Sequence, residues 1–408
     1  SLTMFDIVII AHSFLKIKKF FLFYYNFFRI IEKIFLLFFS FFLFLLVFPV
    51  KKWYNTGKSM GETVMEKKIT LQDIAKTANV TVATVHKALH NKKGVSPEKR
   101  EEILALARSM NYYSEPSVHK TYKIAAVFPG PTNDNRYFYQ YIWKGIHDRA
   151  KELSPCHVEI LDITFDGGQE QQLQVLNHIW ETRHQELSGL LTVVWNETDS
   201  LEVLNRFTDE GIQVFTISAD APFSQRTACI MANPYRSGRL AAEYLGSVLR
   251  QPCRVVIIGT KRDTNNHAQV VRGFFDQMTE SNPLIEIIEL YENVYYPEKL
   301  FETLSEFLHT IDNIMGIYAN NARTTARVCT MVNEIGYQNK VTIIGSELFE
   351  ESKDALKHGI LNAIIDQNGY EQGYKGVSIA FDSIVLGNEV PSKHEINTSL
   401  ILKNNLPL

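Results

Sequence analysis

The chain has 408 residues, a length at which one hydrophobic core stops growing, so two or three domains are expected. Its formal net charge of −3 says little by itself. Four cysteines stand far apart with no C-x-x-C pair, which argues against a zinc site and against a disulfide scaffold. We therefore expect no metal and a reducing, cytoplasmic location. The cysteines are Cys156, Cys229, Cys253 and Cys329.

Residues 1–65 form a hydrophobic leader. Fourteen of the 26 Phe lie before residue 50, and Ile34–Val50 is a run of 17 residues without a charge. At face value this run is a marginal transmembrane helix, and the leader is then a membrane anchor. The competing interpretation is a mis-called start, because AT-rich DNA yields these residues when translated. Met60 and Met65 both offer later starts, and we favour this second interpretation.

Residues 66–113 are predicted to form a three-helix domain. Two short segments within Ile69–Asn91 meet at a polar turn, and each has apolar residues at the spacing of one helix face. A third segment begins at Ser96-Pro97, where Ser is a good N-cap and Pro is tolerated at the first helical position. Thr81 is predicted to cap the second helix, whose N-terminal amides then face outward for a phosphate. This is the chemistry of a helix-turn-helix.

Several stretches of this domain share a pattern with a known family. They are Thr70-Leu71-x-Asp73-Ile74-Ala75, Val80-Thr81-x-Ala83-Thr84-Val85, Val95-Ser96, Arg100 and Tyr112. Together they resemble the DNA-binding headpiece of lactose-repressor (LacI/GalR-type) regulators. The resemblance implies base contacts for Val82, Ala83 and Lys87, where Lys87 replaces the usual Arg and lacks its planar fork for guanine. The implied DNA-binding residues are Thr70, Thr81, Val82, Ala83, Thr84, Lys87 and His90.

The charge distribution agrees with a DNA partner. Residues 66–120 contain ten Lys and Arg against six Asp and Glu, so this basic region precedes an acidic body. A basic domain of this kind is expected if it alone meets the phosphates of double-stranded operator DNA. One recognition helix reads only a few base pairs, whereas a two-fold dimer reads two half-sites, so a homodimer is expected.

Residues 114–121 are predicted to be a short linker. In the resembling family this segment includes a hinge helix whose Leu wedges into the minor groove. Here the linker is shorter and contains no Leu, and Pro116 disfavours helix at Glu115. We therefore favour a flexible linker without the usual intercalation, with Val118 as the alternative wedge.

Residues 122–408 alternate short β-branched runs with helical stretches, which predicts parallel sheets with helices on both faces. The alternation of predicted strands and helices begins again after Arg250, so two lobes are expected. The predicted strands are 124–128, 158–163, 189–194, 214–217, 254–258, 285–290, 314–319 and 341–344. The predicted helices are 139–153, 169–183, 199–210, 234–250, 269–281, 298–311 and 324–335.

Specific motifs in this body also follow a family pattern. They are Lys123-Ile124-Ala125-Ala126-Val127, Ser218-Ala219-Asp220-Ala221-Pro222, Arg272-Gly273-Phe274, Ile364-Ile365-Asp366-Gln367 and Glu371-Gln372-Gly373. They resemble the periplasmic-binding-protein fold of the same regulators, closest to its ribose-binding-like branch. The predicted fold class is thus an all-α helix-turn-helix headpiece plus an α/β two-lobe periplasmic-binding-protein-like domain, which binds an effector and dimerises.

The residues that follow each strand are the candidate effector contacts, because ligands of open α/β sheets sit beyond the carboxyl ends of the strands. Buried hydroxyls of a small carbohydrate-like effector need amide and carboxylate partners, and aromatic faces can stack on its C–H surface. The predicted effector-binding residues are Phe138, Tyr139, Asp220, His267, Asn321, Glu347 and Gln367.

Two positions depart from the family pattern. Val270 stands where an Arg is usual, three residues before the Gly of the Arg-x-x-Gly-Phe motif, and Ser218 stands where an Asp often follows the fourth strand. With that Arg missing and two carboxylates among the candidates, we expect a neutral or amine-bearing polyol rather than a sugar phosphate or acid. An inward-pointing Arg272 or His267 would overturn this expectation.

Catalytic and cofactor motifs are absent from the sequence: it has no G-x-S-x-G elbow, P-loop, H-E-x-x-H or G-x-G-x-x-G. We expect neither an enzyme nor a cofactor. The prediction is a ligand-controlled dimeric transcriptional regulator, most simply a repressor, whose lobes close on the effector and reposition the headpieces. The alternative is a membrane-tethered sugar-binding sensor or solute-binding protein, which requires a real leader and a vestigial headpiece.

Overall fold

The computed structural model describes residues 69–89, 92–110, 112, 121–166, 168–259, 265–291 and 298–407. The predictions for the leader and for the hinge segment of the linker lie outside these residues. Among the helices in the described ranges, none is both long enough and apolar enough to cross a membrane.

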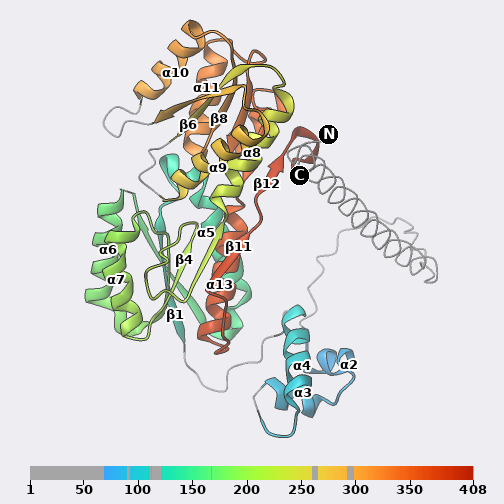
Figure 1. Ribbon diagram of the computed structural model, residues 1–408. Helices are drawn as coiled ribbons and strands as arrows, with labels where there is room; N and C mark the ends of the chain where they lie inside the picture. Colours follow the sequence, from blue (N-terminus) through green and yellow to red (C-terminus); the bar gives the residue numbers. More distant parts are fainter. Residues whose placement is uncertain are drawn as a thin grey trace, which may run out of the picture. The chain divides into compact units, whose positions relative to one another are not determined.

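The first described domain has the three helices that the sequence predicts (Figure 1). They are α2 (Leu71–Thr77), α3 (Val82–Leu89) and α4 (Pro97–Ser109). Each helix contributes a fully buried side chain to one small core, namely Ile74, Val85 and Ile103. Helices this short are marginal in isolation, so the shared core is what stabilises them.

The body contains two six-stranded sheets within the described residues. The alternating pattern predicted eight of these strands and missed Ala228–Ala232, Ala363–Asp366, Lys393–Ile396 and Ser399–Ile401. The sheet of lobe one has the order β11-β5-β4-β3-β1-β2, and that of lobe two β12-β10-β9-β8-β6-β7. All the strand pairs are parallel except β10 with β12. The strands of lobe one are β1 (Tyr122–Pro129), β2 (Val158–Phe165), β3 (Leu187–Thr192), β4 (Gln213–Ile217), β5 (Ala228–Ala232) and β11 (Lys393–Ile396). Those of lobe two are β6 (Cys253–Gly259), β7 (Ile285–Tyr291), β8 (Ile314–Ala319), β9 (Thr342–Ser346), β10 (Ala363–Asp366) and β12 (Ser399–Ile401).

Helices cover both faces of each sheet, and in lobe one α6 and α7 lie across the sheet from α5 and α13 (Figure 1). The helices of lobe one are α5 (Tyr139–Glu152), α6 (Gln169–Arg183), α7 (Glu197–Asp209) and α13 (Gly369–Ile384). Those of lobe two are α8 (Pro234–Val248), α9 (Asn265–Ser281), α10 (Glu298–Thr310), α11 (Ala322–Glu334) and α12 (Glu350–Lys357). Four short 3-10 turns complete the described elements: η1 (Asn133–Tyr137), η2 (Ser154–Cys156), η3 (His184–Glu186) and η4 (Lys403–Asn405).

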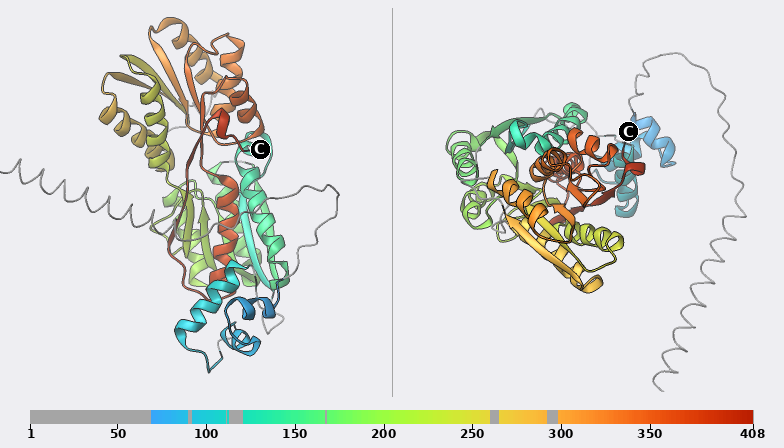
Figure 2. Two further views of the ribbon diagram at one scale, coloured as in Figure 1. Left: turned by 90° about the vertical axis from the view of Figure 1, so that its right-hand side faces the viewer. Right: turned by 90° about the horizontal axis from the view of Figure 1, so that it is seen from above.

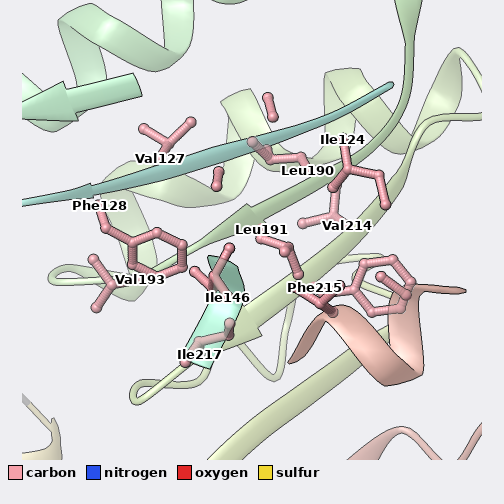
Figure 3. Close-up of a cluster of buried hydrophobic side chains, with 14 of the residues drawn as sticks. Ile124, Val127, Phe128, Ile146, Leu190, Leu191, Val193, Val214, Phe215 and Ile217 are labelled. Carbon is pink, nitrogen blue, oxygen red and sulfur yellow. The ribbon is translucent and has the colours of Figure 1, made fainter. Parts of the chain in front are cut away.

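The central strands of lobe one are buried on both faces. Figure 3 shows Ile124, Leu190 and Phe215 from three neighbouring strands, together with Ile146 from α5. All four side chains are fully buried. Strands buried on both faces read as continuous apolar runs, which explains why the sequence pattern located them within a few residues.

The chain crosses between the lobes three times, and the sequence pattern does not predict the later crossings. After β5 the chain enters α8 of lobe two, after β10 it returns to α13 of lobe one, and β11 is followed by β12 in the other sheet. Lobe one therefore consists of an N-terminal block plus α13 and β11. Helical periodicity identifies a buried face but not the sheet that covers it, so the return of α13 required the structure.

Two pairs of helices pack at glycine contacts. In Figure 2 the red helix α13 runs beside the teal helix α5, and a Cβ on Gly373 would overlap the carbonyl oxygen of Ile142. Gly145 of α5 meets the carbonyl oxygen of Tyr370 in the same way. The absence of a Cβ lets the two helix backbones come this close, so these glycines fix how α13 joins lobe one.

We expect Gly373→Ala to destabilise the protein by about 1–3 kcal/mol or more, because the added methyl group has no space and the helices must separate. Gly168→Ala is the matched control, since Gly168 has a negative φ of −81° and a Cβ added there would have no neighbouring atom within 4 Å. Chemical denaturation of the two variants measures the difference. Equal stability of both variants would contradict this assignment.

Candidate functional site

The outward surface of α3 carries most of the predicted DNA contacts. Val85 and Ala88 face the core, whereas Val82, Ala83 and Lys87 are exposed on the opposite side. A helix with one buried and one exposed face at this spacing is what a helix-turn-helix presents to a major groove. His90 lies outside the described residues.

The threonines of the headpiece act as caps. The Thr81 hydroxyl accepts a hydrogen bond from the Thr84 backbone N–H at 3.2 Å and lies 2.9 Å from the Thr84 hydroxyl, which confirms the predicted cap. The Thr70 hydroxyl lies 2.6 Å from the Asp73 carboxylate in a capping box. Thr70 is thus engaged in holding α2, and its phosphate contact stays a prediction.

The loop after α3 adds positive charge beside this surface. Lys92 and Lys93 are exposed, and the Arg100 guanidinium donates a hydrogen bond to the Lys92 carbonyl oxygen at 2.7 Å. Arg100 therefore ties α4 to the loop that carries both lysines. Exposed cations next to a recognition helix attract the DNA backbone without reading its sequence.

In the body, two predicted effector residues come together at the carboxyl ends of β9 and β10. Glu347 is 4% exposed, and its carboxylate accepts hydrogen bonds from the Gln367 side-chain amide at 2.7 Å and from the Gln367 backbone N–H at 3.3 Å. Glu347 also has a φ of +71°, a backbone conformation that is costly for a residue with a Cβ.

A second acidic residue belongs to this cluster and is absent from the predicted effector-binding residues. Asp366, the last residue of β10, accepts hydrogen bonds from the backbone N–H groups of Asn368 at 3.3 Å and Leu348 at 3.4 Å. Burial raises the pKa of Glu347 well above its ordinary value, and the nearby Asp366 carboxylate raises it further. Burial also raises the pKa of Asp366. Its place directly before Gln367 at a strand end was the available signal.

The corresponding strand end in lobe one has the same backbone geometry. Ser218, after β4, has a φ of +70°, and its N–H donates to the carbonyl oxygen of Ile230 in β5. Glu347 donates in the same way to Ile365 in β10. The two lobes therefore present matching left-handed residues after equivalent strands, at the position where open α/β sheets bind ligands.

Asp220 has a partner that the sequence prediction did not foresee. Arg226 holds both of its carboxylate oxygens, one of them at 2.9 Å, and also donates to the Ser392 carbonyl oxygen. Both side chains are largely buried. A bidentate pair of this kind neutralises the carboxylate within lobe one, so Asp220 does not join Glu347 in an acidic cluster, and the carboxyl group nearest to Glu347 is that of Asp366.

The predicted aromatic contacts follow β1. Phe138 and Tyr139 are half-buried, with ring centroids 5.4 Å apart, and the Tyr139 hydroxyl accepts a hydrogen bond from the Trp195 indole at 3.1 Å. Burial raises the pKa of Tyr139 to about 12. Trp195, which follows β3, is a further aromatic residue at this edge that the sequence analysis did not select.

The remaining predicted residues lie at helix starts of lobe two. Asn321 caps α11, where its side chain accepts from the Thr324 N–H at 2.9 Å. His267 is half-buried in the first turn of α9, next to Asn266, whose side chain donates to the Ser218 carbonyl oxygen of lobe one at 2.6 Å. Both positions therefore border the strand ends.

The neutral-effector prediction depends on Arg272 and Val270, and both residues lie on α9. Arg272 is exposed on α9, with 78% of its side-chain surface accessible, and lies 3.6 Å from Asp276. It is a surface residue and does not restore positive charge to the strand ends. Val270 is buried on α9, and its carbonyl oxygen faces Gly238 of α8, where the two helices pack.

Contacts between the lobes flank these strand ends. The Tyr137 ring of lobe one packs on Phe349 of lobe two with centroids 4.7 Å apart. Beside it, the Arg136 guanidinium lies 3.1 Å from the Glu351 carboxylate. We call these four residues the clasp. Asn265 of α9 makes a separate contact, donating to the Glu197 carboxylate of lobe one at 2.7 Å.

A helix-turn-helix domain followed by a two-lobe binding body with polar strand ends defines a ligand-responsive transcriptional regulator. Comparison with known proteins agrees: residues 70–115 match "Bacterial regulatory proteins, lacI family", and residues 125–389 match "Periplasmic binding protein domain". The second match spans more than half of the chain, so the chain belongs to the periplasmic binding protein domain family, and it carries a lacI-family domain in front of that body. The lacI-type domain disfavours the alternative of a tethered sensor with a vestigial headpiece.

Relatives of this chain include regulators and a binding protein. It is 26% identical to the HTH-type transcriptional regulator DegA of Bacillus subtilis, over 54% of this chain and 63% of DegA. It is 22% identical to the HTH-type transcriptional repressor PurR of Histophilus somni, over 80% of this chain and 95% of PurR. Its structure is similar to GanP, a glucose-galactose binding protein from Geobacillus stearothermophilus, with a TM-score of 0.62 and 27% identity over 71% of this chain and all of GanP.

Glu347→Gln is expected to stabilise the effector-free protein at pH values above the range in which carboxyl groups ordinarily titrate. A raised pKa means that the folded protein holds this proton more tightly, so stability falls as the pH rises from the ordinary value of 4.5 through the raised pKa. The amide removes this loss and keeps an acceptor for Gln367. Thermal melts between pH 4 and about pH 8 measure the effect.

Glu350→Gln is the matched control, because Glu350 is exposed over 75% of its side chain and lies only three residues away. It should leave the pH dependence unchanged. An unchanged or steeper decline of stability with pH in Glu347→Gln would refute the assignment.

Proposed function

We propose that the chain is a repressor that binds operator DNA as a homodimer in the cytoplasm and is controlled by a small sugar-like effector held between the lobes. The observation that carries the effector assignment is the contact between buried Glu347 and half-buried Gln367 at the strand ends. A carboxylate and an amide at one point offer acceptors and a donor, which the hydroxyl groups of a polyol require when they leave water.

The chemistry of the cluster favours a neutral or amine-bearing polyol. Glu347 is buried and Asp366 is half-buried beside it, so an anionic effector would add negative charge at a point where burial already disfavours it. Arg272 lies on the surface, and Val270 replaces the expected Arg. The similarity to GanP, a glucose-galactose binding protein, is consistent with an uncharged sugar.

Control of DNA binding would arise from differential binding of one conformer. The clasp and the contacts of α9 join the two lobes around the strand ends, so an effector held there favours the closed arrangement. A change in lobe closure then alters the spacing of the two headpieces in a dimer, and with it the affinity for paired half-sites.

A thermal-shift screen tests the effector class. We expect a neutral sugar, polyol or amino sugar to stabilise the full chain, by about 2.7 kcal/mol at 100 times its Kd, and its phosphate ester to have little effect. Calorimetric titration of the best compound and of its phosphate then gives the two affinities. Tighter binding of the phosphate would overturn the neutral-effector assignment while leaving the DNA-binding function intact.

Lys87→Ala is expected to weaken binding to the selected operator by about 1–3 kcal/mol and to relax selectivity at one base pair per half-site, because Lys87 occupies a base-reading position. Lys76→Ala is the control, since Lys76 is an exposed lysine on α2. Anisotropy titrations with operator and with scrambled DNA separate the effects. Uniform weakening on all sequences would show instead that Lys87 holds a phosphate.

A further inference from the structure

The first turn of α3 presents apolar chemistry where a recognition helix usually presents polar side chains. Val82 is 41% exposed, and it is the one large apolar side chain of the described headpiece residues that stays exposed. Ala83 beside it is also exposed. Val85 and Ile74 are fully buried, and other large aliphatic side chains such as Val80 and Leu89 are partly buried against the same core. The core therefore does not account for Val82.

The polar groups nearest to this pair are already engaged. The hydroxyls of Thr81 and Thr84 lie 2.9 Å from each other, and Thr81 also caps the helix. Among the outward side chains of α3, Lys87 contributes a charged donor one turn further along. Val82 and Ala83 themselves offer only methyl groups to whatever lies against the helix start.

We propose that Val82 and Ala83 read DNA by contact with the 5-methyl groups of thymine, which makes them specificity-determining residues for a thymine-containing half-site. The inference rests on the proposed DNA-binding function. The N-terminal residues of a recognition helix meet base edges in the major groove, and thymine is the base that displays a methyl group there. Exposed Lys92 and Lys93 supply attraction to phosphate, which holds the helix start against the bases.

This readout predicts a particular chemical sensitivity. Replacing thymine by uracil removes one methyl group and leaves every hydrogen-bonding group of the base in place. Burying a group of that size changes affinity about fourfold. A helix that read the same base through hydrogen bonds would not distinguish thymine from uracil.

The experiment begins with selection of random double-stranded DNA on the full chain, which yields the half-site. Each thymine of the selected duplex is then replaced by deoxyuridine, and binding is measured by fluorescence anisotropy at one salt concentration. We expect a loss of about fourfold at one or two thymines per half-site. In Val82→Ala, which shortens an exposed side chain and favours helix, the uracil effect at one of them should disappear.

Lys87→Ala is the matched control on the same helix: it should weaken binding but keep the thymine-to-uracil ratio. A second control replaces the sensitive thymine by cytosine and then by 5-methylcytosine, whose methyl group should recover part of the lost affinity. If no DNA is enriched, the DNA-binding function fails. If DNA is enriched but uracil has no effect, or Val82→Ala keeps the full effect, or Lys87→Ala also removes it, the methyl readout is wrong.

Discussion

The body depends on the close approach of two pairs of helix backbones. Gly145 and Gly373 dock α13 on α5 in lobe one, and Gly238 and Gly273 dock α8 on α9 in lobe two, each glycine facing a carbonyl oxygen of the partner helix. Because α8 enters lobe two from β5 and α13 returns to lobe one from β10, each lobe contains a helix that the other lobe's sheet leads into. Rigid docking of these helices turns a chain that crosses three times into two defined lobes.

The two sheets have matching strand orders, and this correspondence explains where the candidate site lies. β4 with β5 and β9 with β10 hold equivalent places in the two sheets, and Ser218 and Glu347 follow β4 and β9 with nearly equal positive φ values. Backbone strain of this kind persists only where surrounding structure enforces it, and it gathers at functional sites. Each strained residue is enforced by a hydrogen bond from its N–H to the neighbouring strand, at Ile230 and Ile365.

Sequence reasoning recovered what is local and lost what is distant. Eight strands of the body, seven of its helices and the Thr81 cap follow from patterns a few residues long, whereas β5, β10, β11, β12, α12 and α13 were not predicted. The Arg226 partner of Asp220 lies in the same loop, but no pattern indicates which way either side chain turns. The pairing of Arg136 with Glu351 joins residues 215 positions apart, and the Glu347–Gln367 pair joins adjacent strands. Family position selected Glu347 and Gln367 singly, whereas their contact and the closeness of Asp366 to Glu347 required the packed sheet.

The free energies of individual interactions indicate which groups affect how the two lobes close. The Arg136–Glu351 ion pair is about half exposed on each side, and pairs of this kind contribute about 0–1 kcal/mol and weaken with salt. Glu347 and Asp366 act in the opposite direction, because buried carboxyl groups are costly in their charged form. An effector that donates hydrogen bonds to these oxygens offsets that cost only in the arrangement that encloses it. In the proposed mechanism, the weak bridges between the lobes and a pair of carboxyl groups that disfavours charge keep closure close to balance, which is the condition under which a small ligand can shift it.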